Sequence, residues 1–209
     1  MYTLTDKLYE SLLDDEDDLI SSDNSLIEQF LKDNYEIIGS YKIINKVVNV
    51  MGDIRLINKN ATELTNKLFS FGKISGKFIC SNSNINTLMG GPRETRSFSC
   101  VNCINLKSLR GAPKTTVIFN CSHCERIQNL KFSPKVVNDF LCNFCVKLQS
   151  LEGAPKIVKG DFECNRCPSL KNLDYLPYIN GDLTCDERFI DKIKNNEINI
   201  NVIGEIYSL

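Results

Sequence analysis

The chain has no tryptophan, a single histidine and only three methionines. It also lacks any run of about 18 apolar residues, the minimum length of a transmembrane helix, so no segment is predicted to span a membrane. The opening Met-Tyr-Thr-Leu-Thr-Asp has neither the basic region nor the apolar core of a secretory signal. We therefore expect no export, and we expect the ten cysteines to be reduced thiols without disulfides.

The net charge of −1 conceals a strong asymmetry along the chain. Residues 1–40 contain eleven acidic residues and two lysines, a balance of −9, whereas residues 41–209 contain 15 acidic and 23 basic residues, a balance of +8. An acidic arm on a basic body is typical of a solvated tether. The alternative is an arm that docks on the body or on a basic partner, through an attraction that salt weakens.

Cysteine supplies the strongest pattern in the chain. Four Cys-x-x-Cys pairs recur with their first cysteines 21, 21 and 22 residues apart, at Cys100/Cys103, Cys121/Cys124, Cys142/Cys145 and Cys164/Cys167. Each pair belongs to a longer unit, Phe-x-Cys-x-x-Cys-x-x-Leu-x-x-Leu-x-Gly-Ala-Pro. This period predicts a solenoid, because one coil of about 21 residues cannot bury its own apolar face.

Alignment of the units predicts which side chains share a face. One column holds Phe78, Phe98, Phe119, Phe140, Phe162 and Leu183, and a cysteine column follows two residues later at Cys80, Cys100, Cys121, Cys142, Cys164 and Cys185. Period-two spacing places both columns on the inner face of a short strand. The sequence therefore predicts an α+β, leucine-rich-repeat-like β-solenoid with a ribbon of parallel strands and a cap at each end.

The chain divides into three predicted parts. Residues 1–40 form an acidic helical arm and cap, with one helix over 5–20 and a second from Ser25, whose apolar stripe of Leu26, Ile27, Phe30 and Leu31 covers the open end of the solenoid. Residues 41–185 form the solenoid, in which a hairpin over 41–50 leads into the first coil. Residues 186–209 form a C-terminal cap, with a short helix around Phe189 and Ile190 and an edge strand over 198–202.

The repeat resembles that of a family of solenoid proteins of tailed bacteriophages. Residues 148–155 (Leu-Gln-Ser-Leu-Glu-Gly-Ala-Pro), residues 71–80 at the entry to the first coil and the opening residues 8–18 carry the resemblance, which covers nearly the whole chain. It implies leucine-rich-repeat-like coils, and a location in the cytoplasm of an infected bacterial host cell or in the virion. This chain departs from the family by one residue per coil and by cysteine where the family often has asparagine.

The reactive side chains all have structural explanations. Zinc ligands often come as Cys-x-x-Cys pairs, but here the spacing equals the repeat period, which favours buried sulfur at the same place in each coil. His123 is predicted to face solvent at a coil corner, and Asp139, Asp161 and Asp182 precede the strands, where they are expected to cap turns. No paired acids, triad or phosphate-binding loop is found, so we expect no enzymatic activity and no cofactor, with structural zinc as an alternative.

The variable ribbon positions are the predicted contacts with an unidentified protein of the host or the virion. They are Ile79, Ser99, Asn120, Leu141, Glu163 and Thr184, with Phe144 beside Leu141. Leu141 and Phe144 are expected to form an exposed apolar pair that anchors the partner. The sequence therefore favours a non-enzymatic protein–protein interaction module that is a monomer and does not bind membranes.

A nucleic-acid-binding protein is another alternative. Basic residues recur around the proline turns, as at a phosphate-binding edge; they are Arg93, Arg96, Arg110, Lys114, Lys131, Lys135, Lys156 and Lys159. Against this reading, most aromatic residues belong to the core column, which leaves few platforms on which bases can stack.

Overall fold

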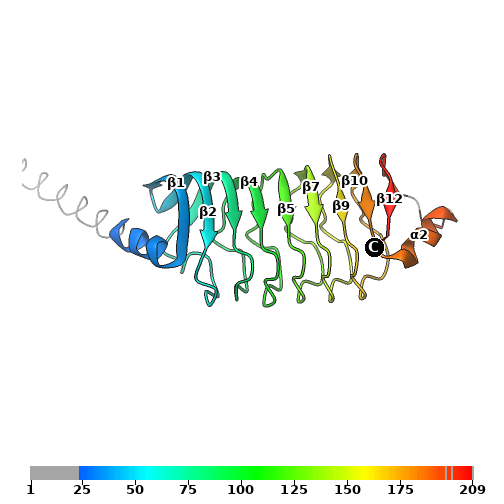
Figure 1. The fold of residues 1–209 in the computed structure, drawn as a ribbon, viewed down its shortest axis with the longest axis horizontal. Helices are drawn as coiled ribbons and strands as arrows, with labels where there is room; N and C mark the ends of the chain where they lie inside the picture. The colour runs from blue at the N-terminus through cyan, green and yellow to red at the C-terminus, as the bar shows by residue number, and fades with distance from the viewer. Residues whose placement is uncertain (1–23, 196, 199, 209) are drawn as a thin grey trace, which may run out of the picture.

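The structure, a computed structural model, describes residues 24–195, 197–198 and 200–208. These residues form a β-solenoid whose coils stack along one long axis (Figure 1). One strand of each coil joins a nine-stranded sheet in the order β1-β2-β3-β4-β5-β7-β9-β11-β12. The predicted β-solenoid with coils of about 21 residues is confirmed.

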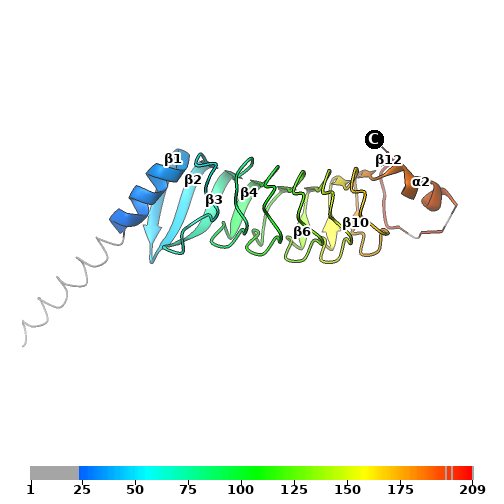
Figure 2. The same ribbon diagram turned by 90° about the horizontal axis from the view of Figure 1, so that it is seen from below.

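The large sheet begins with an antiparallel hairpin of β1 and β2 and continues as a parallel ribbon. Its strands are β1 (Tyr35–Ile44), β2 (Val47–Leu56), β3 (Ser70–Ile79), β4 (Glu94–Ser99), β5 (Ile118–Asn120), β7 (Asp139–Leu141), β9 (Phe162–Glu163), β11 (Leu183–Thr184) and β12 (Ile206–Tyr207). A second, three-stranded parallel sheet lies on another side of the coils, as Figure 2 shows, and consists of β6 (Val136–Val137), β8 (Ile157–Val158) and β10 (Tyr178–Ile179).

Equivalent residues stack in register inside the solenoid, as the sequence predicts. The five phenylalanine rings from Phe78 to Phe162 have centroids 5.3 to 5.5 Å apart and planes within 12° of each other. Each ring is completely buried, and so is each cysteine of the column that follows. Such stacks contribute beyond the burial of their area, about 0.5 to 1.5 kcal/mol per aromatic pair.

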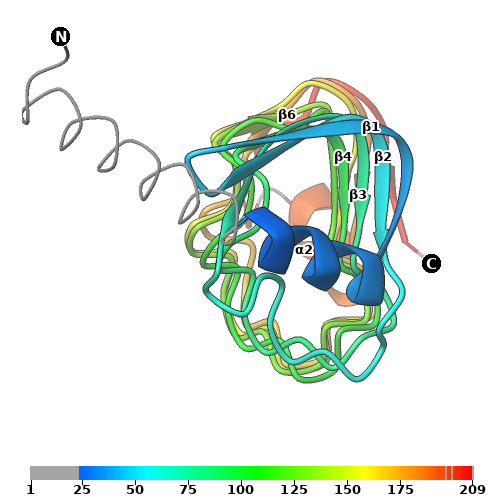
Figure 3. The ribbon, with the colours of Figure 1, turned by 90° about the vertical axis from the view of Figure 1, so that its left-hand side faces the viewer.

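Two local features shape the β1–β2 hairpin. Asn45 and Lys46 have φ angles of 50° and 58°, the conformation of a two-residue type I′ turn. Gly39 lies opposite Gly52, with φ angles of 133° and 141°, and a Cβ on either residue would collide with backbone of the other strand. This glycine pair allows a close approach of the two strands. Figure 3 shows β1 turning from one side of the coil to the next.

A helix covers the N-terminal end of the core. Residues 24–34 are helical, and Ile27 and Leu31 are buried against the first coil. Leu26 is 58% exposed, so its predicted place in the capping stripe is wrong; it lies one position beyond the inward face. Tyr35 directly follows the helix, and its hydroxyl donates a hydrogen bond to the carbonyl of Leu64 at 2.6 Å. The predicted helix over 5–20 lies outside the described residues.

The C-terminal cap is only partly as predicted. The short helix is confirmed as α2 (Glu187–Lys194), with Phe189 and Ile190 buried. The predicted edge strand over 198–202 is wrong. Among its described residues only Val202 pairs, through a single bridge to Ile179, and Ile198 and Ile200 pack against the core without pairing. The large sheet ends with β12, and every described helix is too short or too polar to span a bilayer.

Candidate functional site

The predicted contact residues on the strands form one row, which we name the outer row. Strand register aligns Ile79, Ser99, Asn120, Leu141, Glu163 and Thr184, and extends the row to Arg55 on β2 and Tyr207 on β12. The six predicted members are half-buried. The expectation that Leu141 is exposed is therefore wrong, because equivalent side chains one coil away flank it on both sides.

Some polar members of the outer row are engaged within the solenoid. The hydroxyl of Ser99 lies 2.8 Å from the hydroxyl of Ser81, and the carboxylate of Glu163 accepts a hydrogen bond from the side-chain amide of Asn143. These bonds join neighbouring coils.

Phe144 lies at a corner of the coil, apart from the outer row. Its column shares a left-handed backbone with φ between 54° and 60°, and consists of Asn82, Asn102, His123, Phe144 and Arg166. The Phe144 ring stacks on the His123 ring at 4.3 Å, and the guanidinium of Arg166 lies 5.1 Å from its centroid on the following coil. Phe144 is therefore half-buried in a ladder, so the predicted exposed pair with Leu141 is wrong. The prediction that His123 faces solvent at a corner is confirmed.

A second left-handed corner contains two residues that the sequence analysis missed. Its column has φ between 66° and 97° and consists of Gly90, Gly111, Phe132, Gly153 and Tyr175. Phe132 and Tyr175 are 59% and 65% exposed. A bulky residue at this φ is strained, and strain of this kind is common at functional sites. The signal in the sequence was the loss of glycine from the Gly-Ala-Pro motif in these two coils.

The cysteines form a ladder of thiol donors and backbone acceptors. The second thiol of each pair donates to the carbonyl of the first cysteine in the preceding coil, as from Cys124 to Cys100 at 3.1 Å and from Cys145 to Cys121 at 3.3 Å. In the first coil Ser83 takes the place of this cysteine, but its hydroxyl donates within its own coil, to the Cys80 carbonyl at 2.6 Å, which also accepts the Cys103 thiol. The second cysteine of each pair therefore supplies a hydrogen-bond donor to a buried backbone carbonyl that lies beyond the end of the strand.

Burial suppresses the reactivity of several of these thiols. Removal from water raises the pKa of Cys142 and of Cys164 well above the ordinary thiol value, and raises the pKa of Cys167 to about 12. A protonated, inaccessible thiol is a poor nucleophile and a poor metal ligand. Within the described part of the chain, no three His, Cys, Asp or Glu side chains converge as a metal site requires.

The carboxylates at the start of β7 and just before β9 and β11 accept hydrogen bonds from the backbone of the next coil. Asp139 accepts the backbone amide of Asp161 at 3.1 Å, Asp161 accepts that of Asp182 at 2.9 Å, and Asp182 accepts that of Glu205 at 2.8 Å. The prediction that these aspartates have a structural role is therefore confirmed. The bonds join coils in series, however, and do not cap a single turn.

The predicted basic residues are all exposed, and three of them surround a hollow. The hollow has a volume of about 480 Å³ and is lined by Lys114, Lys135 and Lys159, with Val117 and Val136 among its apolar neighbours. It lies where the second sheet begins, at the edge of β6. Elsewhere on this edge Lys131 is paired with Glu152 at 2.9 Å.

Comparison with protein families, with curated proteins and with solved structures finds no match for this chain. The resemblance to phage repeat proteins therefore remains a hypothesis that rests on the repeat motif.

Proposed function

We propose that the protein is a non-enzymatic scaffold that binds another protein through its outer row and the adjoining corner ladder. Following the phage resemblance, the partner is a protein of the host or the virion.

The contrast between the two faces of the ribbon carries this proposal. The inward columns repeat phenylalanine and cysteine from coil to coil, because every coil must fill the same space. The outer row stands in the same register, yet its members include aliphatic, hydroxyl, amide and acidic side chains. Stacking does not require this variety, and a solenoid typically uses such a surface for recognition.

The middle of the ribbon provides the best anchor. Leu141 stands between Asn120 and Glu163 in the outer row, and Phe144 on the same coil is held between His123 and Arg166. Side chains that neighbouring coils already hold in one conformation lose little conformational entropy when a partner binds. Aromatic and arginine side chains also contribute most of the binding energy at many protein interfaces.

The test is affinity purification with three forms of the full chain. Leu141→Asp places a charge in the outer row, and Ile157→Asp is the matched control on the second sheet, where Ile157 is 41% exposed. We expect wild type and Ile157→Asp to retain the same partner and Leu141→Asp to lose it, with thermal unfolding of both variants within a few degrees of wild type. Retention by Leu141→Asp, or equal loss from both variants, would contradict the proposal.

The lysine-lined hollow favours nucleic-acid binding as a second candidate function. Lysines at such a site bind phosphate by charge, so affinity falls steeply with salt. A mobility shift that disappears in Lys114→Glu/Lys135→Glu and in high salt would support it. Unchanged migration of single- and double-stranded probes at low salt would exclude it.

A further inference from the structure

The first strand of the large sheet has a free edge. β1 pairs with β2 on one side and with no strand on the other among the described residues. The backbone amide of Ile57 donates to the carbonyl of Asn34 at one end of the hairpin, and a two-residue turn closes the other end after Ile44. In an antiparallel ladder bonded pairs alternate, so the even-numbered residues of β1 bond to β2.

The odd-numbered residues therefore present their backbone N–H and C=O groups to the free edge; from Ile37 onward they are Ile37, Gly39, Tyr41 and Ile43. No hydrogen bond engages these backbone groups in the described part of the chain. Their side chains face the inner side of the sheet, where the edge has neither proline nor charge. Proline and inward-pointing charge are the usual devices by which proteins block strand addition at an edge.

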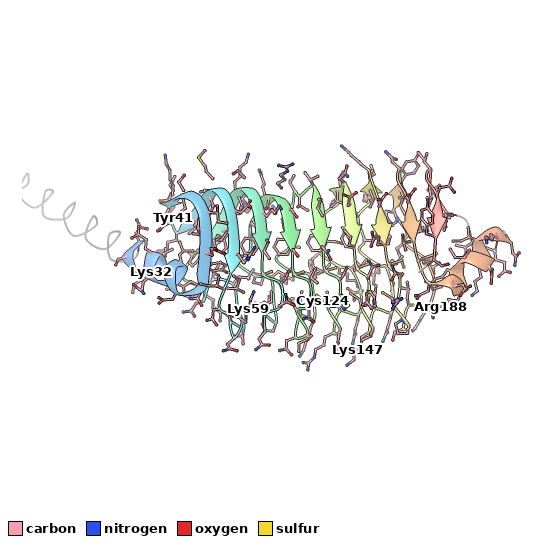
Figure 4. The ribbon with its side chains drawn as sticks, viewed as in Figure 1. Lys32, Tyr41, Lys59, Cys124, Lys147 and Arg188 are labelled. Carbon is pink, nitrogen blue, oxygen red and sulfur yellow. The ribbon has the colours of Figure 1, made fainter. Side chains whose placement is uncertain are left out.

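A hollow accompanies this edge. It has a volume of about 430 Å³ and lies between the helical residues 24–34 and β1, with Leu31, Tyr35, Ile37 and Tyr41 among its lining residues. Figure 4 shows Lys32 on the helix and Tyr41 on β1 at this same end of the solenoid. One wall is thus an open strand and the other a helix, the arrangement in which a domain adds a peptide as an extra strand and receives its alternate side chains in a groove.

We propose that the free edge of β1 binds an extended peptide segment of another protein as an additional strand, with apolar side chains at every second position seated in the hollow. This surface is distinct from the outer row. The lining includes Glu28 and Lys32, one residue of each charge, so it does not favour a charged peptide. The alternation of apolar residues follows from the geometry of an added strand, whose successive side chains point to opposite faces.

The helix argues for a peptide and against a second copy of the chain. Figures 1 and 2 both show the helical residues projecting beyond β1 along the long axis. Two solenoids that met edge to edge at β1 would each drive this helix into the end of the other. A single extended strand has no such projection.

The experiment uses the full chain and a random library of peptides about as long as the ten-residue β1. Enriched peptides should carry apolar residues at alternate positions. N-methylation of backbone amides in one alternating phase should weaken binding about tenfold by removing edge hydrogen bonds, and methylation in the other phase should have little effect. Ile37→Lys should reduce affinity for the same peptides, and Ile157→Lys, on the second sheet, should not.

Amide hydrogen exchange of the full chain without peptide tests the edge itself. The amides of Ile37, Tyr41 and Ile43 should exchange rapidly and become protected when peptide is added, while those of Ile38 and Lys42 are protected throughout. The proposal is overturned if no peptide is enriched, if both phases of N-methylation act alike, or if the edge amides are already protected.

Discussion

Replacing Cys124 with alanine tests the thiol–carbonyl ladder. Cys124 is completely buried, and its thiol donates to the carbonyl of Cys100 at 3.1 Å. Among the described residues this is the only hydrogen bond that the Cys100 carbonyl accepts. Alanine would leave a buried acceptor without a donor. The matched control is Cys121→Ala in the same coil, because the Cys121 thiol is equally buried but donates to no carbonyl among the described residues.

The magnitude follows from the difference between these two variants. Each loses one buried sulfur, so the cost of the cavity largely cancels. An unsatisfied buried carbonyl costs about 1 to 3 kcal/mol, and a thiol is a weak donor, so we expect Cys124→Ala to be less stable than Cys121→Ala by about 1 to 2 kcal/mol. For a chain of this size that corresponds to a difference in Tm of about 2 to 8 °C.

Thermal unfolding under reducing conditions measures this difference, and Cys124→Ser is a further comparison. Ser83 shows that a hydroxyl in this column donates to the first cysteine carbonyl of its own coil, at 2.6 Å, whereas the thiols donate to the preceding coil. A serine at 124 with that geometry would donate to the Cys121 carbonyl and leave the Cys100 carbonyl unpaired, so we expect Cys124→Ser to recover little of the stability lost in Cys124→Ala. Equal stabilities of the two alanine variants, or a serine variant as stable as wild type, would refute the reasoning.

Two further predictions concern pH and the hairpin. Burial raises the pKa of Cys142 and Cys164 in the folded chain, whereas in the unfolded chain a thiol ionises near pH 8.5. Above that pH the unfolded state binds fewer protons than the folded state. The free energy of unfolding is therefore preserved below about pH 8.5 and should fall by about 1.4 kcal/mol per thiol for each pH unit above it. Denaturant titrations at pH 8 and 10 measure this change, and equal free energies at the two pH values would contradict the prediction. Gly52→Ala should destabilise the protein by about 3 kcal/mol, because the added Cβ meets the carbonyl of Ile38 at a φ of 141°. The control is Met51→Ala, because Met51 lies on the same strand and is 73% exposed; similar Tm values for the two variants would contradict the prediction.

The core of this fold could be predicted from the sequence, because stacked coils require a side chain of similar size at the same position in every coil. Phe98, Phe119 and Phe140 recur at the repeat period, and the register of the sheet follows from that recurrence alone. The N-terminal helix and α2 were also predictable, since apolar residues at helical spacing must cover the ends of the stack.

The surface was less predictable, because exposure depends on neighbours that are distant in the sequence. Alternation correctly turned Leu141 outward, yet the coils on either side half-cover it. The turn at Asn45 and Lys46 lacks the glycine that usually signals a type I′ turn, so the extent of the hairpin was missed. The free edge of β1 is a property of strand order, which no local pattern contains.

Phe132 offers a way to separate stability from function at this surface. Most coils place glycine at its corner, where φ is left-handed, and Phe132 adopts a φ of 74° while 59% of it remains exposed. Loss of a buried phenylalanine costs about 3 to 5 kcal/mol, but Phe132→Gly removes a strain of about 1 to 2 kcal/mol and little buried area. We therefore expect its thermal stability to equal or exceed that of wild type.

Phe132 lies outside the outer row and the Phe144 ladder, so weaker partner binding by Phe132→Gly would extend the contact surface to this second corner, and strain of this kind is common at functional sites. Affinity purification with Phe132→Gly, run beside Phe119→Leu as a core variant, separates the two effects. Phe119→Leu should lower Tm and preserve binding. A loss of stability in Phe132→Gly as large as in the core variant would show that the ring belongs to the packing of its coil and not to a contact surface.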